Sequence, residues 1–268
     1  MGAETQKTRR TYFSHPLVDE SLKCLPAALD HQDPKDFRKY VVDHVPQNSL
    51  KGRQRIARDM LQRFAPDGKL NLPLAAAVAQ FGNSRASREV LFFELLNVYP
   101  MLQEVAIHWV AELPPEGGSR AGLRQFLEPK IPGRSTEKVA KDSMTTMHQC
   151  GKVARPKVGW YRAVWATPPT EVFLYALARL CPEATMVRVD LFSGLPIHRA
   201  MLWPSSSIED LLREAERAGH ISKISRLDQY HQFTLAGSGR DRLKLLLPNL
   251  PNPSLQPSLF AAAEEESQ

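Results

Sequence analysis

The fold is decided at residues 34–64, PKDFRKYVVDHVPQNSLKGRQRIARDMLQRF, which predict two helices joined by a short turn. The first helix is expected over 34–44, with Asp33 as N-cap and Pro34 at a position where its missing N–H costs little. Ser49 is expected to cap the second helix, in which apolar residues recur every three or four positions. A short helix, a tight turn and a second helix are the outline of a helix-turn-helix DNA reader.

The second helix of this pair is strongly basic. Between Ser49 and Phe64 the chain has five basic residues and one acid, Asp59, for a net charge of +4. A helix of this kind can contact phosphates through its side chains and through the N–H groups at its N-terminus. The pattern fits either a nucleic-acid contact or an ordinary solvated face. The basic residues are Lys51, Arg53, Arg55, Arg58 and Arg63.

Length, charge and composition narrow the class of protein. The chain has 268 residues, a formal net charge of +6 and 43% hydrophobic residues. This is enough for two or three small domains with real cores, and clustered positive charge favours a polyanionic partner. The three cysteines form no CxxC pair, so neither a disulfide framework nor a zinc ribbon is predicted. No apolar run approaches the roughly 20 residues of a membrane-spanning helix, so we expect a cytoplasmic protein without membrane association.

The chain divides into four expected segments. Residues 1–14 are polar and basic and are expected to form a flexible arm. Residues 15–130 should form a helical domain with the helix-turn-helix-like pair, and 131–247 one or more winged-helix-like domains. Residues 248–268 contain four prolines and end in AAAEEESQ, which predicts a disordered acidic tail. The expected fold class is mainly α, a helical bundle with helix-turn-helix or winged-helix-like units and short β-hairpins.

The N-terminal core is expected from two apolar helices. Ser84 or Ser87 can cap the first, which runs to Tyr99, and Pro100 separates it from a second helix over 101–113. Core packing is the simplest interpretation of their side chains, which recur at helical spacing. The expected core residues are Phe92, Phe93, Leu96, Val105, Trp109 and Val110.

Two later stretches each predict a capped helix followed by a β-hairpin. In the first, Ser135 is expected to cap a helix that runs to Gln149, and residues 152–165, KVARPKVGWYRAVW, are basic and β-prone. In the second, Ser207 is expected to cap a helix that precedes a hairpin over 220–235. A capped helix followed by a basic hairpin is typical of a winged helix-turn-helix. The two stretches are alike in outline only.

The sequence offers no common catalytic pattern. It contains no GxxxxGK[ST], GxGxxG, HExxH or GxSxG motif. His148 and Cys150 are the nearest metal-like pair, but they lack two further ligands at a recognisable spacing. Glu183 and Asp190 flank a predicted strand as in some metal-dependent nucleases, yet the lysine that usually follows the second acid is missing. We therefore expect a protein that is not an enzyme and uses no metal or cofactor.

The order of these features resembles one family. The chain has a basic NSLKGRQRIARDMLQRF helix, a core of aromatic helices, a GRSTEKVAKDSMTTMHQCGKV stretch followed by Pro-Pro and a helix, and a final AGHISKISRLDQYHQFTL hairpin. Together, over about residues 17–247, these are similar to the BrxA proteins of bacteriophage exclusion (BREX) systems. The resemblance implies a mainly helical protein that binds double-stranded DNA in phage defence. A methyltransferase, an ATPase and a phosphatase-like subunit would be its partners and carry the chemistry.

The resemblance also implies which residues contact DNA. Gln54 is the main candidate for reading a base edge, and with few such residues only modest sequence preference is expected. Two alternatives stay open: a scaffold whose winged units dock protein partners, and an RNA-binding or transcription-regulating protein. The remaining candidate contacts are Ser49, Lys51, Arg53, Arg55 and Arg58 in the first unit, and Arg134, Ser135, Lys138, Lys141, Lys152, Arg155 and Lys157 in the second.

Overall fold

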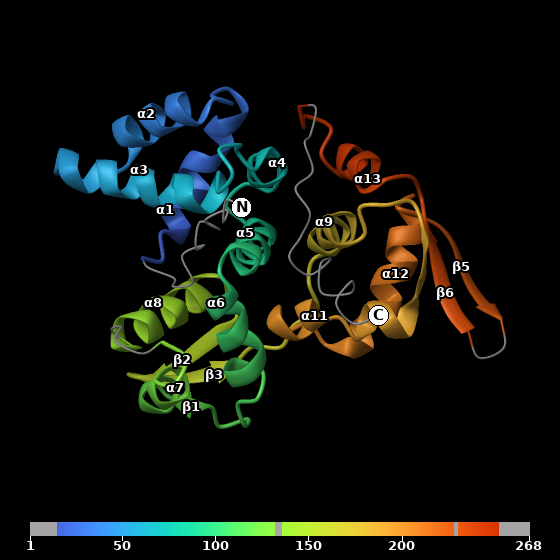
Figure 1. The fold of residues 1–268 in the computed structure, drawn as a ribbon. Helices are drawn as coiled ribbons and strands as arrows, with labels where there is room; N and C mark the ends of the chain where they lie inside the picture. The colour runs from blue at the N-terminus through green and yellow to red at the C-terminus, as the bar shows by residue number, and fades with distance from the viewer. Residues whose placement is uncertain (1–14, 132–135, 228–229, 252–268) are drawn as a thin grey trace, which may run out of the picture.

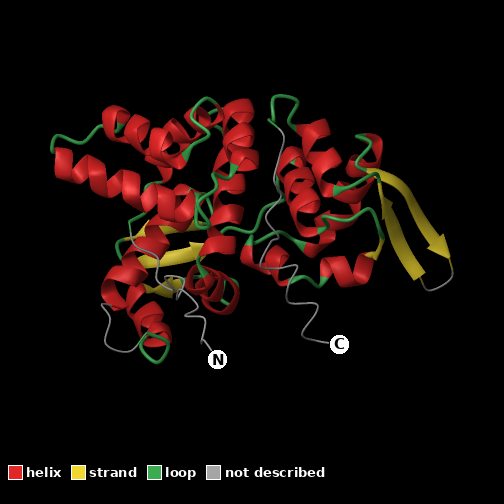
Figure 2. Cartoon of the chain, turned by 45° about the horizontal axis from the view of Figure 1, so that its top comes forward, coloured by secondary structure: helices red, strands yellow, loops and turns green. Residues whose placement is uncertain are grey.

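The computed structural model describes residues 15–131, 136–227 and 230–251. Helices dominate, and two small antiparallel sheets complete the structure, so the expected mainly-α class is confirmed. Figure 2 shows one sheet among the helices and the long hairpin of the other at the opposite end of the molecule. The predicted arm over 1–14 lies outside the described residues, as does most of the predicted acidic tail.

The two helices predicted over residues 34–64 are present with the expected caps. Asp33 Oδ1 accepts a hydrogen bond from the Lys35 N–H at 2.7 Å, and Ser49 Oγ accepts one from the Gly52 N–H at 3.1 Å. Each bond satisfies an N–H group that the first turn of a helix leaves without a partner. The N-terminal elements are α1 (Val18–Cys24), the 3₁₀ helix η1 (Leu25–Leu29), α2 (Pro34–His44), α3 (Leu50–Phe64) and α4 (Leu72–Phe81).

Helix α5 (Arg85–Val98) runs through the centre of the molecule (Figure 1). Ser84 caps it by accepting a hydrogen bond from the Ser87 N–H at 3.2 Å, which decides between the two expected caps. Helix α6 (Pro100–Val105) then continues into a single π-helical turn, η2 (Ala106–Val110), rather than into a regular helix to residue 113. The expected core is confirmed except at Trp109, which is only partly buried.

A buried carboxylate on α5 joins the two halves of the chain. Helix α9 (Thr170–Leu180) packs beside α5 and aims Tyr175 and Arg179 at Glu94. Glu94 Oε1 accepts hydrogen bonds from the Tyr175 hydroxyl at 2.6 Å and from Arg179 Nε at 3.0 Å. Asn71 Nδ2 donates to the other carboxylate oxygen at 2.9 Å. Burial and the nearby Glu94 charge raise the pKa of Tyr175, so this hydroxyl stays protonated and donates.

A second buried carboxylate on α5 corrects one expected DNA contact. Lys152 is 3% exposed, and its Nζ lies 2.9 Å from Glu89 Oε2 and 3.0 Å from the Met201 carbonyl oxygen. Burial lowers the pKa of Lys152, and the Glu89 charge opposes that shift. Trp203 Nε1 also donates to Glu89, at 3.2 Å. Lys152 therefore holds the core together and is not on a surface that DNA could reach.

The middle of the chain forms a helical pair and a three-stranded sheet. The sheet has the order β1-β3-β2, with all neighbours antiparallel, so the hairpin expected over 152–165 is confirmed. Gly159 turns the chain between its two long strands at a φ of 69°, a conformation that costs glycine little. The elements are β1 (Gly118–Ser119), α7 (Arg120–Leu127), α8 (Thr136–Gln149), β2 (Val153–Lys157) and β3 (Trp160–Ala163). The predicted cap Ser135 lies outside the described residues.

The last part repeats this arrangement with a sheet of order β4-β6-β5, and the hairpin expected over 220–235 is confirmed. Ser207 does not cap α12, because it already has helical dihedral angles and its hydroxyl donates to the Pro204 carbonyl at 2.7 Å. The elements are β4 (Met186–Arg188), α10 (Val189–Ser193), α11 (Pro196–Ala200), the 3₁₀ turn η3 (Ser205–Ser207), α12 (Ile208–Arg217), β5 (Ile221–Leu227), β6 (Tyr230–Leu235) and α13 (Gly239–Leu246).

Candidate nucleic-acid interface

The outward face of α3 carries most of its predicted DNA contacts. Four exposed side chains follow the spacing of one helical stripe: Lys51, Gln54, Arg55 and Arg58. Arg53 is half-buried instead, and its Nη1 donates to the Val42 carbonyl of α2 at 3.3 Å. Ser49 uses its hydroxyl for the cap. The stripe therefore offers three cations and one amide to a partner, while its neighbours hold the helix in place.

Arg63 was expected on the basic surface of α3 but is buried, with 2% of its surface exposed. Its guanidinium donates to the carbonyl oxygens of His15 and, at 2.9 Å, Pro16. The helical spacing explains this position, because Arg63 follows the buried Ile56 and Met60 along the inward stripe. Arg63 thus holds the segment that precedes α1 in place. Because it is buried, it is not part of the basic surface of α3.

The outward face of α8 forms a second basic stripe. Lys138, Lys141 and His148 are exposed along it, and Thr145 lies half-buried between them. Arg155 of β2 donates from Nη2 to Thr145 Oγ1 at 3.0 Å, so the stripe continues onto the hairpin. At the tip of that hairpin, Lys157 Nζ lies 4.6 Å from the centroid of the Trp160 ring. Exposed cations therefore lie on both the helix and the hairpin, and the bond between Arg155 and Thr145 joins the two elements.

His15 brings the two basic helices together. Its N–H donates to Asp142 Oδ2 of α8 at 3.1 Å, and its ring Nδ1 lies 3.1 Å from Asp59 Oδ2 of α3. Burial lowers the pKa of His15, and the positive charges of Lys138 and Arg55 lower it further. Both cations therefore lie near the same imidazole, one from each helix. Figure 1 shows α1, which follows His15, between α3 and α8.

Each acid of these two helices has a partner, and for Asp59 this includes Arg58 on the outward face of α3, whose Nη2 lies 3.3 Å from Asp59 Oδ1. Asp59 and Asp142 are 6% and 7% exposed and lie beneath His15. Glu137, at the start of α8, pairs with Arg120 of α7 at 3.2 Å. On α8 both acids are buried or paired while Lys138 and Lys141 are exposed, so the outward face of this helix is more positive than its composition alone indicates.

We refer to this region as the α3–α8 surface. It combines predicted residues from both units, whereas the buried Lys152 and the half-buried Arg53 do not belong to it. Arg134 and Ser135, also predicted, lie outside the described residues. His15 was not found from the sequence, because its role depends on contacts with two distant helices. The surface is defined by Lys51, Gln54, Arg55, Arg58, Lys138, Lys141, Arg155 and Lys157.

The corresponding helix of the last unit has the opposite charge. Helix α12 contains four acids and two basic residues, for a net charge of −2. Glu209 pairs with Arg226 of β5, and Glu216 Oε1 accepts a hydrogen bond from the Ile224 N–H at 2.9 Å. A net negative helix repels phosphates. The two helix-and-hairpin units therefore differ in the partners that their charges favour.

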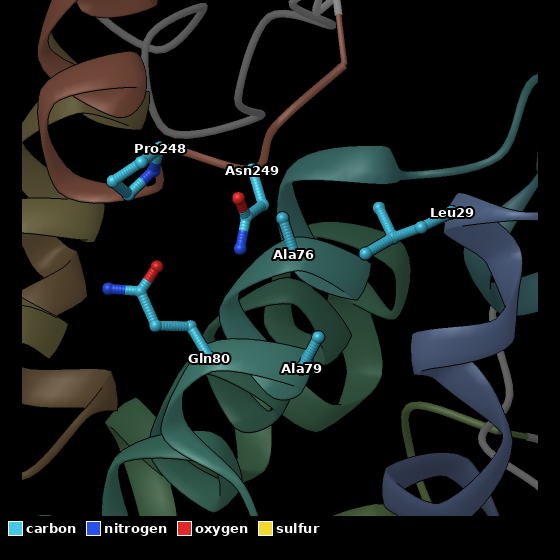
Figure 3. A pocket seen from close by; sticks show the side chains of 6 residues that line it. All are labelled: Leu29, Ala76, Ala79, Gln80, Pro248 and Asn249. Atoms are coloured by element: carbon cyan, nitrogen blue, oxygen red, sulfur yellow. The ribbon is translucent and has the colours of Figure 1, made fainter.

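The described residues also form a pocket away from the α3–α8 surface. A cavity of about 320 Å³ lies between α4 and the end of the described chain (Figure 3). Gln80 and Asn249 contribute its amides, and Gln80 Nε2 already donates to the Leu246 carbonyl at 2.9 Å. None of its lining residues can act as an acid, a base or a nucleophile. The lining residues are Leu29, Ala76, Ala79, Gln80, Pro248 and Asn249.

The next feature is the set of His, Cys, Asp and Glu side chains that could bind a metal or react as a thiol in the described part of the chain. There, no three His, Cys, Asp or Glu side chains are grouped so that they could hold a metal ion. Burial raises the pKa of Cys150 to about 12, and His148 Nδ1 is hydrogen-bonded at 3.0 Å to the Val153 carbonyl. Asp190 is bound by Arg188, which lowers the pKa of its carboxyl group.

No single helix within residues 15–131, 136–227 and 230–251 is both long enough and apolar enough to cross a membrane. One pair, Arg85–Val98 with Pro100–Val110, meets the length and composition criteria only when taken together, and it is bent by 113°.

Comparisons with known proteins add information on the fold. No protein-family model matches the sequence, and a search of curated proteins finds no match. An SspB crystal structure is similar, with a TM-score of 0.60 and 12% identity over 95% of this chain and 94% of that one. A magnesium ion-bound SspB crystal structure gives a TM-score of 0.59 and 13% identity, with the same coverage. At such low identity, the likeness shows that the overall fold is shared.

Proposed function

We propose that this protein is a non-enzymatic, DNA-binding component of a phage-defence system and that it holds duplex DNA on the α3–α8 surface. One observation carries the proposal: the exposed cations Arg55 of α3 and Lys138 of α8 both act on the same side chain, His15, which contacts the buried Asp59 and Asp142. Burying carboxylates is costly unless they are paired. In this arrangement both carboxylates are paired and far less exposed than the cations of the surface.

The topology around α8 supports the same conclusion. A helix, a short strand, two helices and a hairpin follow one another, and the sheet order is β1-β3-β2. This is the order of a winged helix-turn-helix, in which α8 would be the recognition helix and the β2–β3 hairpin the wing. Helices α2 and α3, joined by a short turn, would form a second helix-turn-helix-like contact. In both units, cations would neutralise phosphates. In the α2–α3 unit, Gln54 would also reach a base edge.

The main expected property is steep salt dependence. The α3–α8 surface offers seven cations: Lys51, Arg55, Arg58, Lys138, Lys141, Arg155 and Lys157. If about six of them contact phosphates, affinity should fall about 1,000-fold between roughly 50 and 200 mM salt, because each contact releases condensed counterions from the duplex.

This prediction is tested by fluorescence anisotropy of a labelled DNA duplex titrated with the full-length protein at several salt concentrations. A steep, linear loss of log affinity with log salt supports the phosphate contacts. Affinity that stays constant across this range contradicts them. Single-stranded DNA and RNA of the same sequence are included, and preference for single-stranded RNA would favour the RNA-binding alternative.

The place of the protein in phage defence rests on the similarity of its sequence pattern to the BrxA proteins. On this proposal, the methyltransferase, ATPase and phosphatase-like proteins of the system are its partners, and the protein itself works in the cytoplasm. The last unit, whose helix α12 is acidic, favours a protein-docking role next to the DNA-binding one. Partners that still copurify with a variant that has lost DNA binding would support this second role.

A further inference from the structure

His15 lies where the two basic helices meet, and contacts from both of them fix its position. Its backbone N–H donates to Asp142 Oδ2 of α8 at 3.1 Å, and its ring Nδ1 lies 3.1 Å from Asp59 Oδ2 of α3. The Arg63 guanidinium donates to the His15 carbonyl oxygen. The φ of His15 is 63°, a left-handed conformation that histidine adopts when such contacts hold it. The imidazole is therefore fixed at the point where α3 and α8 approach each other.

Each carboxylate that contacts His15 has a cation of the α3–α8 surface beside it. On α3, Arg55 precedes Asp59 by four residues, about one helical turn. On α8, Lys138 precedes Asp142 by the same spacing. Side chains at this spacing lie on the same face of a helix, so both cations lie near the imidazole. The carboxylates favour a charged imidazole and the cations oppose it. The charged groups that the structure describes around His15 are Asp59, Asp142, Arg55, Lys138, Arg58 and Arg63.

In the protein without a partner, the neutral imidazole is favoured. Burial is the largest cause that lowers the pKa of His15, and the charges of Lys138 and Arg55 lower it further. Asp59 opposes this shift, but its Oδ1 lies 3.3 Å from Nη2 of the exposed Arg58. The Asp59 carboxylate is thus shared between an arginine of the surface and the imidazole. At neutral pH His15 is therefore mostly uncharged.

We propose that His15 takes up a proton when duplex DNA binds to the α3–α8 surface, so that binding strengthens as the pH falls. This inference rests on the proposed function. Phosphates that pair with Arg55 and Lys138 cancel the positive charges that oppose the imidazolium. A phosphate that draws Arg58 away leaves Asp59 to the imidazole. Both changes raise the pKa of His15 in the complex, and a group that gains a proton on binding makes the affinity depend on pH.

The direction of this effect follows from the two states of His15. Above the pKa of the complex, the imidazole is neutral in the free and in the bound protein, and its titration does not affect affinity. Between the pKa of the free protein and that of the complex, only the complex binds the proton, so affinity rises as the pH falls. We expect affinity to rise about 3- to 10-fold from about pH 7.5 to about pH 5.5, since a shift of one pKa unit corresponds to a tenfold change.

The test is an anisotropy titration of a labelled duplex over this pH range at constant salt, with the wild-type protein and His15→Asn. Asparagine tolerates the left-handed backbone of this position and has no titratable group. The matched control is His231→Asn in the last unit. There the ring Nδ1 lies 3.3 Å from Glu209 Oε1 and 25% of the His231 side chain is exposed, against 3.1 Å and 31% for His15. The wild-type protein and the control should show the rise in affinity, and His15→Asn should lose it.

The outcomes separate this inference from the proposed function. If the wild-type protein binds no duplex DNA at any pH, both are wrong. If it binds with the same affinity at every pH, or if His15→Asn keeps the full pH dependence, only the inference is overturned. A loss of pH dependence in both variants also overturns it, because the effect would then not be specific to His15. A loss confined to His15→Asn supports it.

A second measurement decides the question if circular dichroism melts show that His15→Asn is unstable. The imidazole of His15 is then titrated by NMR in the wild-type protein, with and without a duplex. A higher pKa in the presence of the duplex supports the inference, and an unchanged or lower pKa overturns it.

Discussion

A quadruple alanine variant of the α3–α8 surface is expected to bind duplex DNA about 4,000-fold more weakly than the wild-type protein at 100 mM salt. The variant removes cations that face outward from α3 and α8, and each lost phosphate contact weakens binding by roughly eightfold at this salt concentration. Stability should change little, because the side chains are exposed. The four substituted residues are Arg55, Arg58, Lys138 and Lys141.

A matched variant makes this result specific to the surface. It also replaces two arginines and two lysines at exposed positions, but in the last unit, where α12 is acidic. Anisotropy titrations give the affinities, and circular dichroism melts show that both variants are folded. The proposal is wrong if the two variants lose affinity equally or if the first retains wild-type binding. The control residues are Arg213, Arg217, Lys223 and Lys244.

Replacing Glu94 by alanine is expected to lower the free energy of unfolding by about 3 to 5 kcal/mol. Glu94 is 3% exposed and accepts hydrogen bonds from Tyr175, Arg179 and Asn71. Without the carboxylate, the guanidinium of Arg179 would stay buried without its counter-charge, and the Tyr175 hydroxyl would lose its acceptor. The melting temperature should fall by about 10 °C, given roughly 2 to 4 °C per kcal/mol for a chain of this size.

A control variant of the same chemistry is Glu104→Ala. Glu104 lies on α6 and pairs with Lys130 at 2.8 Å, but its side chain is 41% exposed. Exposed ion pairs contribute about 1 kcal/mol or less, so this variant should melt close to wild type. Thermal and urea unfolding measure both effects. If Glu94→Ala costs no more than Glu104→Ala, the buried carboxylate does not hold the halves of the chain together.

The local elements of this fold could be predicted from the sequence because their determinants are local. Ser49 caps α3 through the Gly52 N–H, three residues away, and Asp33 caps α2 through the Lys35 N–H. The two hairpins follow from their β-prone sequences and from turn residues such as Gly159. In each case the residues that determine the structure lie within one short window.

Two local predictions failed although a signal was present. Ser207 was expected to cap α12, but the preceding 3₁₀ turn had already placed it in a helical conformation. Helix α13 was not predicted, although Ser238 and Asp241 form a capping box at its start. The spacing of Ser238 and Asp241 is therefore a local signal that predicts the start of this helix.

The candidate site could be predicted in parts and not as a whole. Helical spacing separates the outward cations of α3 and α8 from their apolar faces. The burial of Lys152 could not be predicted in this way, because it depends on Glu89, which lies on a helix far from it in sequence. The meeting of α3 and α8 at His15 depends on a hydrogen bond between residues 127 positions apart. Only the folded chain brings these groups together.

The central claim, that the α3–α8 surface is the DNA contact, is tested most directly by hydrogen–deuterium exchange of the full-length protein with and without duplex DNA. We expect slower exchange on DNA binding in peptides from 49–64 and 136–163, and unchanged exchange in 208–227. Protection confined to 208–227, or no protection in 49–64 and 136–163 while DNA is bound, would contradict it.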